Sequence, residues 1–133
     1  MPAELIDGTA IAARIRGEVS AEVATLKASG VVPRLTFVIL GDDPASAVYV
    51  AGKGRACVEV GMDENTIRLL ASTSQHELME LLDCLNADQA VHGILVQSPF
   101  PKQIDPGAVI RRIDPSKDVD GFHPVNVGKL LAG

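Results

Sequence analysis

Three polar side chains recur at helical spacing before the middle of the chain. Ser46, Tyr49 and Lys53 are separated by three and four positions, which places all three on one face of an α-helix. A hydroxyl, a phenol and an amine that converge in this way could transfer protons or polarise a substrate nitrogen. The alternative is that Tyr49 only packs and Lys53 is solvated, and this motif alone leaves both interpretations open.

Tyr49 and Lys53 also have the Tyr-x-x-x-Lys spacing of the catalytic pair in short-chain dehydrogenases. Those enzymes carry a Gly-rich dinucleotide-binding turn upstream of the pair. No G-x-G-x-x-G cluster precedes Tyr49, and the isolated glycines at 41, 52 and 54 cannot enclose a pyrophosphate. We therefore do not expect a short-chain dehydrogenase, and we predict no cofactor-binding residues in this chain.

A second candidate group lies where an apolar run ends in the segment QSPFP. Gln97 follows Gly93–Val96 and precedes Ser98 and two prolines. The amide of a glutamine both donates and accepts hydrogen bonds, so Gln97 could hold an amine while also contacting a substrate. A glutamine at the end of a strand can equally be a boundary that faces solvent.

Two acidic residues make up the third group, in the segment KDVDGFHP. Asp118 and Asp120 precede Gly121, which permits an unusual backbone turn. The carboxylates could cap that turn or accept paired N–H donors from a ligand such as an aminopyrimidine ring. A calcium loop would need more acidic residues at alternating positions, so we predict no metal site. We interpret His123 as structural.

These side chains need a scaffold, and the periodicity of apolar residues predicts one. Asp43 and Pro44 have the residue types of a helix N-cap and first helical position, and Ser74 with Glu77 forms a capping-box pattern. Apolar residues at spacings of three and four from Ile11 to Leu26 indicate an amphipathic helix. We predict helices over 10–28, 44–60, 75–85 and 106–113, and strands over 35–40, 65–70 and 93–96.

Alternating strands and helices are typical of an α/β domain. We predict one three-layer domain over residues 1–133, with a mostly parallel sheet flanked by helices, and an irregular chain after Val96 apart from the short helix over 106–113. Ligands of such sheets bind beyond the carboxyl ends of the strands. The segments GDDPAS, QSPFP and KDVDGFHP are expected near those ends.

The composition excludes two classes of partner. A net charge of −5, one Tyr, three Phe and no Trp provide neither a basic stripe nor stacking platforms for nucleic acid. No stretch approaches the roughly 20 apolar residues of a membrane span, and no signal-peptide pattern begins the chain. We expect a cytoplasmic protein without membrane partners, in which Cys57 and Cys84 are reduced and buried.

Three segments together resemble, in order and spacing, the signature regions of the bifunctional methylenetetrahydrofolate dehydrogenase/cyclohydrolase family. They are GDDPASAVYVAGKGRACVEVGM, VHGILVQSPFPKQID and DPSKDVDGFHPVNVGKL. The resemblance implies a folate substrate, a homodimer and NADP as cofactor. Members oxidise 5,10-methylenetetrahydrofolate and hydrolyse the methenyl product to 10-formyltetrahydrofolate.

The resemblance also implies a role for each polar residue. Lys53 would be the catalytic lysine, Tyr49 its partner against the folate rings, and Gln97 the amide that tunes the lysine. Asp120 would bind the amide and amine edge of the pterin, and Asp118 would hold the loop. The remaining residues that the resemblance assigns to the substrate site are Ser46, Val96, Ser98, Gly121 and Pro124.

The resemblance covers only the N-terminal, folate-binding part of that family. Its members continue into a Rossmann-type domain that binds the nicotinamide cofactor, whereas this sequence ends at Gly133. We therefore expect a catalytic domain that cannot hold NADP by itself. The alternative is a folate-binding module or assembly fragment without turnover. Ser98 and Phe100 stand where many relatives have aliphatic residues, a change that would reshape the pocket wall.

Overall fold

The computed structural model describes residues 5–133, in which helices and strands alternate. The elements are α1 (Gly8–Ala28), β1 (Arg34–Leu40), α2 (Pro44–Glu59), β2 (Asp63–Leu69), α3 (Gln75–Ala87), β3 (Gly93–Gln97), α4 (Pro106–Arg112) and α5 (Pro124–Ala132). The strands are parallel in the order β2-β1-β3. The predicted α/β fold with a parallel sheet is confirmed.

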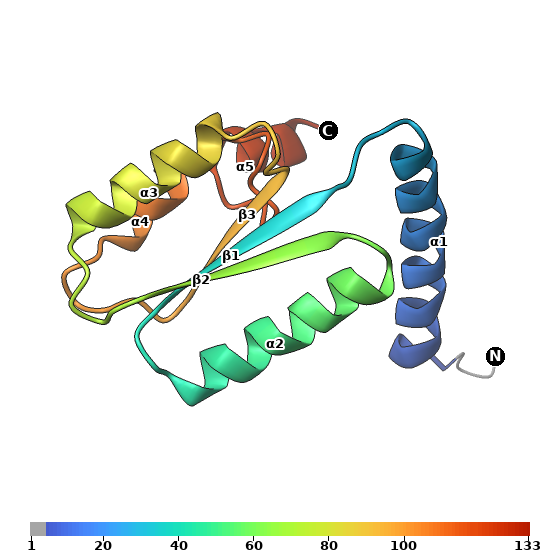
Figure 1. The fold of residues 1–133 in the computed structure, drawn as a ribbon, viewed down its shortest axis with the longest axis horizontal. Helices are drawn as coiled ribbons and strands as arrows, with labels where there is room; N and C mark the ends of the chain where they lie inside the picture. The colour runs from blue at the N-terminus through green and yellow to red at the C-terminus, as the bar shows by residue number, and fades with distance from the viewer. Residues whose placement is uncertain (1–4) are drawn as a thin grey trace.

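Side chains of the central strand alternate between two cores, which makes the domain three-layered (Figure 1). Phe37 and Ile39 pack with Val50 and Cys57 on the side of α2. Val38 and Leu40 point to the opposite face, where α3 and α4 cover the sheet. All seven residues of β1 are at least half-buried, and this is why the strand reads as an almost uninterrupted apolar run.

The predicted helix starts are confirmed by their hydrogen bonds. The carboxylate of Asp43 accepts a bond from the backbone N–H of Ser46 at 2.7 Å, and Pro44 is the first residue of α2. Ser74 and Glu77 form the reciprocal capping box of α3. The strand boundaries differ slightly from expectation, since β2 begins two residues before Asn65.

The first helix is correctly predicted, but most of its apolar face is not buried against the domain. Only Val23 of α1 is buried, next to the turn at Gly61, whereas Ile15 is 48% exposed. Figure 1 shows α1 beside the end of the sheet and not against either face. Periodicity predicted the helix because apolar spacing is a local property. Where the helix packs depends on residues that are distant in the sequence.

The irregular chain expected after α4 instead contains a further helix, α5. Pro124 occupies its first position, where a missing N–H has no cost. The imidazole Nδ1 of His123 accepts a hydrogen bond from the backbone N–H of Val125 at 3.2 Å. Proline here begins a helix instead of preventing one, and the structural interpretation of His123 is confirmed.

The two cysteines lie in different environments, which corrects the expectation that both are buried. Cys57 is buried in the core on the α2 side, and burial together with the nearby charge of Glu64 raises its pKa. Cys84 is exposed because it lies on the outer face of α3, whose inner face carries Leu82 and Leu85. Among the described residues, no helix combines the length and apolar character that crossing a bilayer requires.

Candidate functional site

Helix α2, strand β3 with the segment after it, helix α4 and the loop before α5 meet around one pocket of about 340 Å³. This volume lies within the range of small-molecule sites. Lys53 enters from α2, Gln97 and Ser98 from the end of β3, and Asp120 from the loop. The full lining is Lys53, Leu95, Val96, Gln97, Ser98, Phe100, Pro106, Val109, Ile110, Ile113, Asp118, Asp120 and Phe122.

A lysine and a glutamine from separate elements face each other in this pocket. The ammonium Nζ of Lys53 donates to Oε1 of Gln97 at 3.3 Å, and Nε2 of Gln97 donates to the carbonyl oxygen of Ser98 at 2.8 Å. Because a carbonyl only accepts, it holds the amide nitrogen on its own side and leaves the amide oxygen toward Lys53. The amide orientation therefore suits a cationic partner.

Ser46 and Tyr49 lie on the helix face of Lys53 but do not line the pocket. Ser46 is only 4% exposed, and its hydroxyl is within hydrogen-bond distance of Asp43 Oδ2 at 2.8 Å and of the Ser98 carbonyl at 3.4 Å. It links the start of α2 to the segment after β3. Tyr49 is 66% exposed, with its ring centroid 6.0 Å from Nζ of Lys53.

Tyr49 instead borders a neighbouring hollow. An open depression of about 470 Å³ on α2 is lined by Tyr49, Gly52 and Lys53, among others. Lys53 lines both this hollow and the main pocket. A ligand that reached from the pocket past the lysine would therefore contact the tyrosine ring.

Asp120 is the pocket carboxylate whose charge is least stabilised. Its burial raises the pKa above the ordinary value, Lys53 opposes this with its positive charge, and the negative charge of Asp118 adds to the rise. The pocket thus contains a carboxylate that gains from a ligand able to donate hydrogen bonds to it.

Asp118 holds the loop, as predicted. It accepts backbone hydrogen bonds from Gly121 at 3.1 Å and His123 at 2.9 Å, and a side-chain bond from Asn126 at 2.9 Å. Burial acts to raise its pKa, but the hydrogen bonds together outweigh burial and lower it. Gly121 has φ +73°, a conformation that favours glycine. Gly121 and Pro124 shape the turn and the start of α5 without lining the pocket.

The sequence analysis named Val96 and Phe100 of the apolar pocket wall but not the residues that α4 contributes to it. Four of its residues come from α4 and the residue after it: Pro106, Val109, Ile110 and Ile113. The signal available was the apolar side of the helix predicted over 106–113. That periodicity does not say which surface the helix covers, and only the packing of α4 beside β3 places it at the site.

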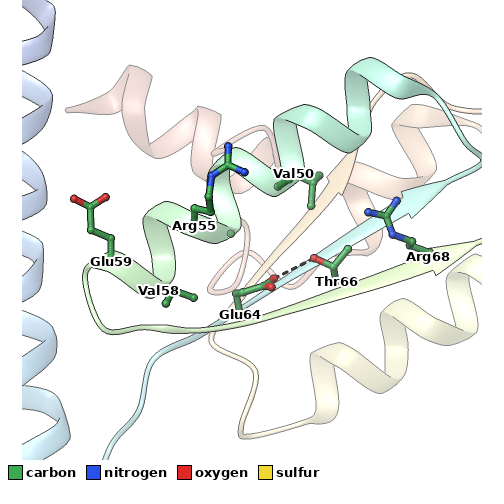
Figure 2. Close-up of a pocket in the computed structure, with 9 residues that line it drawn as sticks. Val50, Arg55, Val58, Glu59, Glu64, Thr66 and Arg68 are labelled. Atoms are coloured by element: carbon green, nitrogen blue, oxygen red, sulfur yellow. Dashed lines mark hydrogen bonds between the residues drawn. The ribbon is translucent and has the colours of Figure 1, made fainter.

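A larger hollow of about 650 Å³ lies between α2 and β2, and shares no lining residue with the site (Figure 2). Glu64, Thr66 and Arg68 line it from the strand, and Arg55 is among those on the helix side. The Thr66 hydroxyl donates to Oε2 of Glu64 at 3.0 Å. Size alone does not make it the catalytic pocket, because the lysine, the amide and Asp120 all lie in the smaller one.

The residues of 5–133 do not fit the pyrophosphate of a dinucleotide. The N-terminus of a helix after a strand is the usual phosphate site, but at α2 it is occupied by the Asp43 carboxylate. The hydrogen bonds from Ser46 lower the pKa of Asp43 and keep it negative. Across the same residues, no group of three His, Cys, Asp or Glu side chains is placed to hold a metal ion.

The fold and the pocket define a small-molecule-binding α/β domain with a lysine–amide pair at the carboxyl ends of a parallel sheet. Residues 6–120 match the family model described as "Tetrahydrofolate dehydrogenase/cyclohydrolase, catalytic domain". This chain therefore belongs to the tetrahydrofolate dehydrogenase/cyclohydrolase family.

Individual relatives agree with this assignment. The bifunctional protein FolD of Geotalea daltonii is 54% identical over 98% of this chain and 47% of its own length. The FolD dehydrogenase/cyclohydrolase structure from Campylobacter jejuni is 44% identical with a TM-score of 0.92, covering 93% of this chain and 44% of that one. The Trypanosoma brucei enzyme complexed with NADP cofactor and inhibitor is 39% identical with a TM-score of 0.89. This match covers 98% of this chain and 45% of that one. The chain spans about half the length of these relatives.

Proposed function

We propose that this chain is the N-terminal, folate-binding catalytic domain of a methylenetetrahydrofolate dehydrogenase/methenyltetrahydrofolate cyclohydrolase. The observation that carries the proposal is the pair formed by Lys53 and Gln97 at 3.3 Å, in a pocket that also contains Asp120. Proton transfer and recognition of a nitrogen-rich ring are thereby available in one site. The family membership supplies the substrate class.

Asp120 would bind the edge of the pterin ring. The pterin presents adjacent N–H donors, which a carboxylate accepts, while the apolar wall formed by Val109 and Ile113 would cover a ring face. A pocket of about 340 Å³ accommodates a bicyclic ring but not the whole folate. The remainder of the ligand would extend past Lys53 toward the exposed Tyr49.

Lys53 would move the protons of the hydrolytic step. Water adds to the cationic methenyl carbon and loses a proton to the amine form of Lys53. The protonated lysine then returns that proton to N5 as the bond from N5 to carbon breaks. The new hydroxyl loses its remaining proton to solvent as its oxygen becomes the carbonyl of the formyl group on N10, so one proton is released overall. Gln97 keeps Nζ in place because its amide oxygen is turned toward the lysine.

We also propose that the whole protein uses NADP, which would accept hydride from the methylene carbon. The residues described here do not form its phosphate site, so their contribution to that step is to orient the folate and exclude water from one ring face. A homodimer and a cytoplasmic location complete the proposal. Two free thiols, Cys57 and Cys84, suit a reducing compartment.

The deciding experiment pairs titration with a folate analogue and a methenyltetrahydrofolate hydrolysis assay. We expect binding by the wild-type chain and hydrolysis that falls by about 10²-fold or more in Lys53→Met. Lys102→Met, at an exposed position, is the matched control and should leave the rate unchanged. Binding with no hydrolysis above the Lys53→Met background would favour a folate-binding module, and full hydrolysis by Lys53→Met would refute the assigned role.

A further inference from the structure

The hollow on α2 beside the lysine pocket lies at a glycine on the helix surface. Two rows of residues border it at helical spacings of four and three: Val48, Gly52 and Arg55 in one, and Tyr49, Lys53 and Ala56 in the other. Gly52 has no side chain, so the first row is interrupted at its centre. The hollow therefore opens directly beside Lys53, which also lines the main pocket.

Arg55 supplies a positive charge at the far side of this hollow. Its Nη2 atom lies 4.0 Å from the position that a Cβ of Gly52 would take, so the guanidinium is folded back along α2 toward the gap. Figure 2 shows it directed away from Glu64 and strand β2. None of the ion pairs within residues 5–133 involves Arg55. Its charge is therefore available to a ligand.

The guanidinium of Arg55 lies within reach of a ligand that passes Lys53 and Tyr49. The ring centroid of Tyr49 is 6.0 Å from Nζ of Lys53. Gly52 follows Tyr49 by three residues, so the guanidinium over Gly52 lies about 4.5 Å further along the helix axis than Tyr49. A group seated beside the tyrosine ring would thus bring its next substituent close to the arginine.

A folate carries the anionic substituent that suits this charge. Beyond the pterin it has a p-aminobenzoyl group and then one or more glutamyl residues, each of which adds a carboxylate. The main pocket of about 340 Å³ holds only the bicyclic ring, so these groups would lie over α2. A guanidinium donates two parallel N–H bonds to one carboxylate, which makes arginine well suited to bind such a tail.

We propose that Arg55 binds a carboxylate of the glutamyl tail and makes this site prefer folates with several glutamyl residues. The inference rests on the proposed function, since it requires the pterin in the main pocket. Lys53 is less suited to the tail because it is bonded to Gln97. Arg68 lines the separate hollow beside β2 and not the one at Tyr49. Arg55 is thus a specificity-determining residue without a part in proton transfer.

Isothermal titration of the 133-residue chain at low salt tests this role. The three probes differ only in their tails: 5-formyltetrahydropteroate, which has no glutamate, and 5-formyltetrahydrofolate with one and with three glutamyl residues. We expect the wild type to bind the triglutamate about fivefold or more tightly than the pteroate, as for an exposed bidentate ion pair. Arg55→Gln should lose this preference and bind the pteroate as the wild type does.

Arg68→Gln is the matched control, because it removes the same charge at an exposed position outside the hollow. It should keep the preference for the triglutamate. Equal affinities of the wild type for all three probes, or an undiminished preference in Arg55→Gln, would overturn the inference, while binding of the pteroate would still support the folate proposal. A chain that binds none of the probes would refute the proposed function and this inference together.

Charge reversal provides a second measurement that a change in folding would not reproduce. Arg55→Glu should bind the triglutamate more weakly than the pteroate, because like charges repel each other. Arg68→Glu changes the net charge equally and should keep the wild-type order. The wild-type preference should also decrease as salt is added, since exposed charges are screened. An inverted order in both variants would assign the effect to net charge and contradict the role of Arg55.

Discussion

Lys53 and Gln97 are 44 positions apart in the chain, yet Nζ of one lies 3.3 Å from Oε1 of the other. The helix α2 carries the lysine and the end of β3 carries the amide. Both elements pack against the central strand β1, one on its face and one at its side. The pair therefore exists only because the sheet is parallel and β3 lies next to β1.

Removal of the amide should impair hydrolysis more than stability. In Gln97→Leu, Lys53 loses its acceptor, and we expect methenyltetrahydrofolate hydrolysis to fall by about tenfold or more while folding is nearly unchanged. Gln97→Glu keeps an acceptor for Lys53 and should retain more of the rate than Gln97→Leu. Gln89→Leu, at an exposed position, is the control, and equal rates in all variants would contradict the role of Gln97.

Asp120→Asn should separate binding from stability. The variant loses the anionic acceptor, so a folate analogue should bind about tenfold more weakly or worse. Because burial raises the folded-state pKa of Asp120 above 3.8, ionisation costs folding stability as pH rises through that folded-state pKa. Thermal unfolding should therefore show Asp120→Asn to be more stable than wild type at pH 7 but not below about pH 3.8. A stability loss at pH 7 would contradict this account.

Asp118 should have the opposite pH dependence. Its hydrogen bonds lower the folded-state pKa below 3.8, so its contribution to stability is complete above that value and disappears as pH falls through the folded-state pKa. We expect Asp118→Asn to cost about 1–2 kcal/mol at pH 7, measured by urea unfolding, and to cost progressively less in acid. Asp42→Asn, at an exposed position, is the control at pH 7 for the loss of one carboxylate.

Gly93 should not tolerate a side chain. A Cβ at this position would lie 2.6 Å from Val119 Cγ1 and 2.9 Å from Leu35 Cδ1. We expect Gly93→Ala to destabilise the domain by about 1–3 kcal/mol and to weaken folate binding, because Val119 adjoins Asp120. Gly17→Ala, in the interior of α1 with open space around it, should be neutral or stabilising. Equal melting temperatures for Gly93→Ala and wild type would refute the clash.

The sequence by itself determined the local features of this protein. Asp43 with Pro44, and Ser74 with Glu77, start helices through hydrogen bonds that reach only three residues, and alternation of apolar runs indicated the parallel sheet. The signature segments identified the family and predicted the residues of the site. The catalytic and binding roles of those residues remain predictions.

Only the tertiary structure decided which surfaces meet. It left the apolar face of α1 largely exposed, placed Val109 and Ile113 in the pocket wall and, within residues 5–133, paired β2 with β1 alone. It also showed that Tyr49 lies outside the main pocket while Lys53 lies within it. Periodicity follows from the geometry of one segment, whereas burial depends on elements distant in the chain. For that reason the sequence could name the lysine and its polar neighbours but not the α4 residues that wall the pocket.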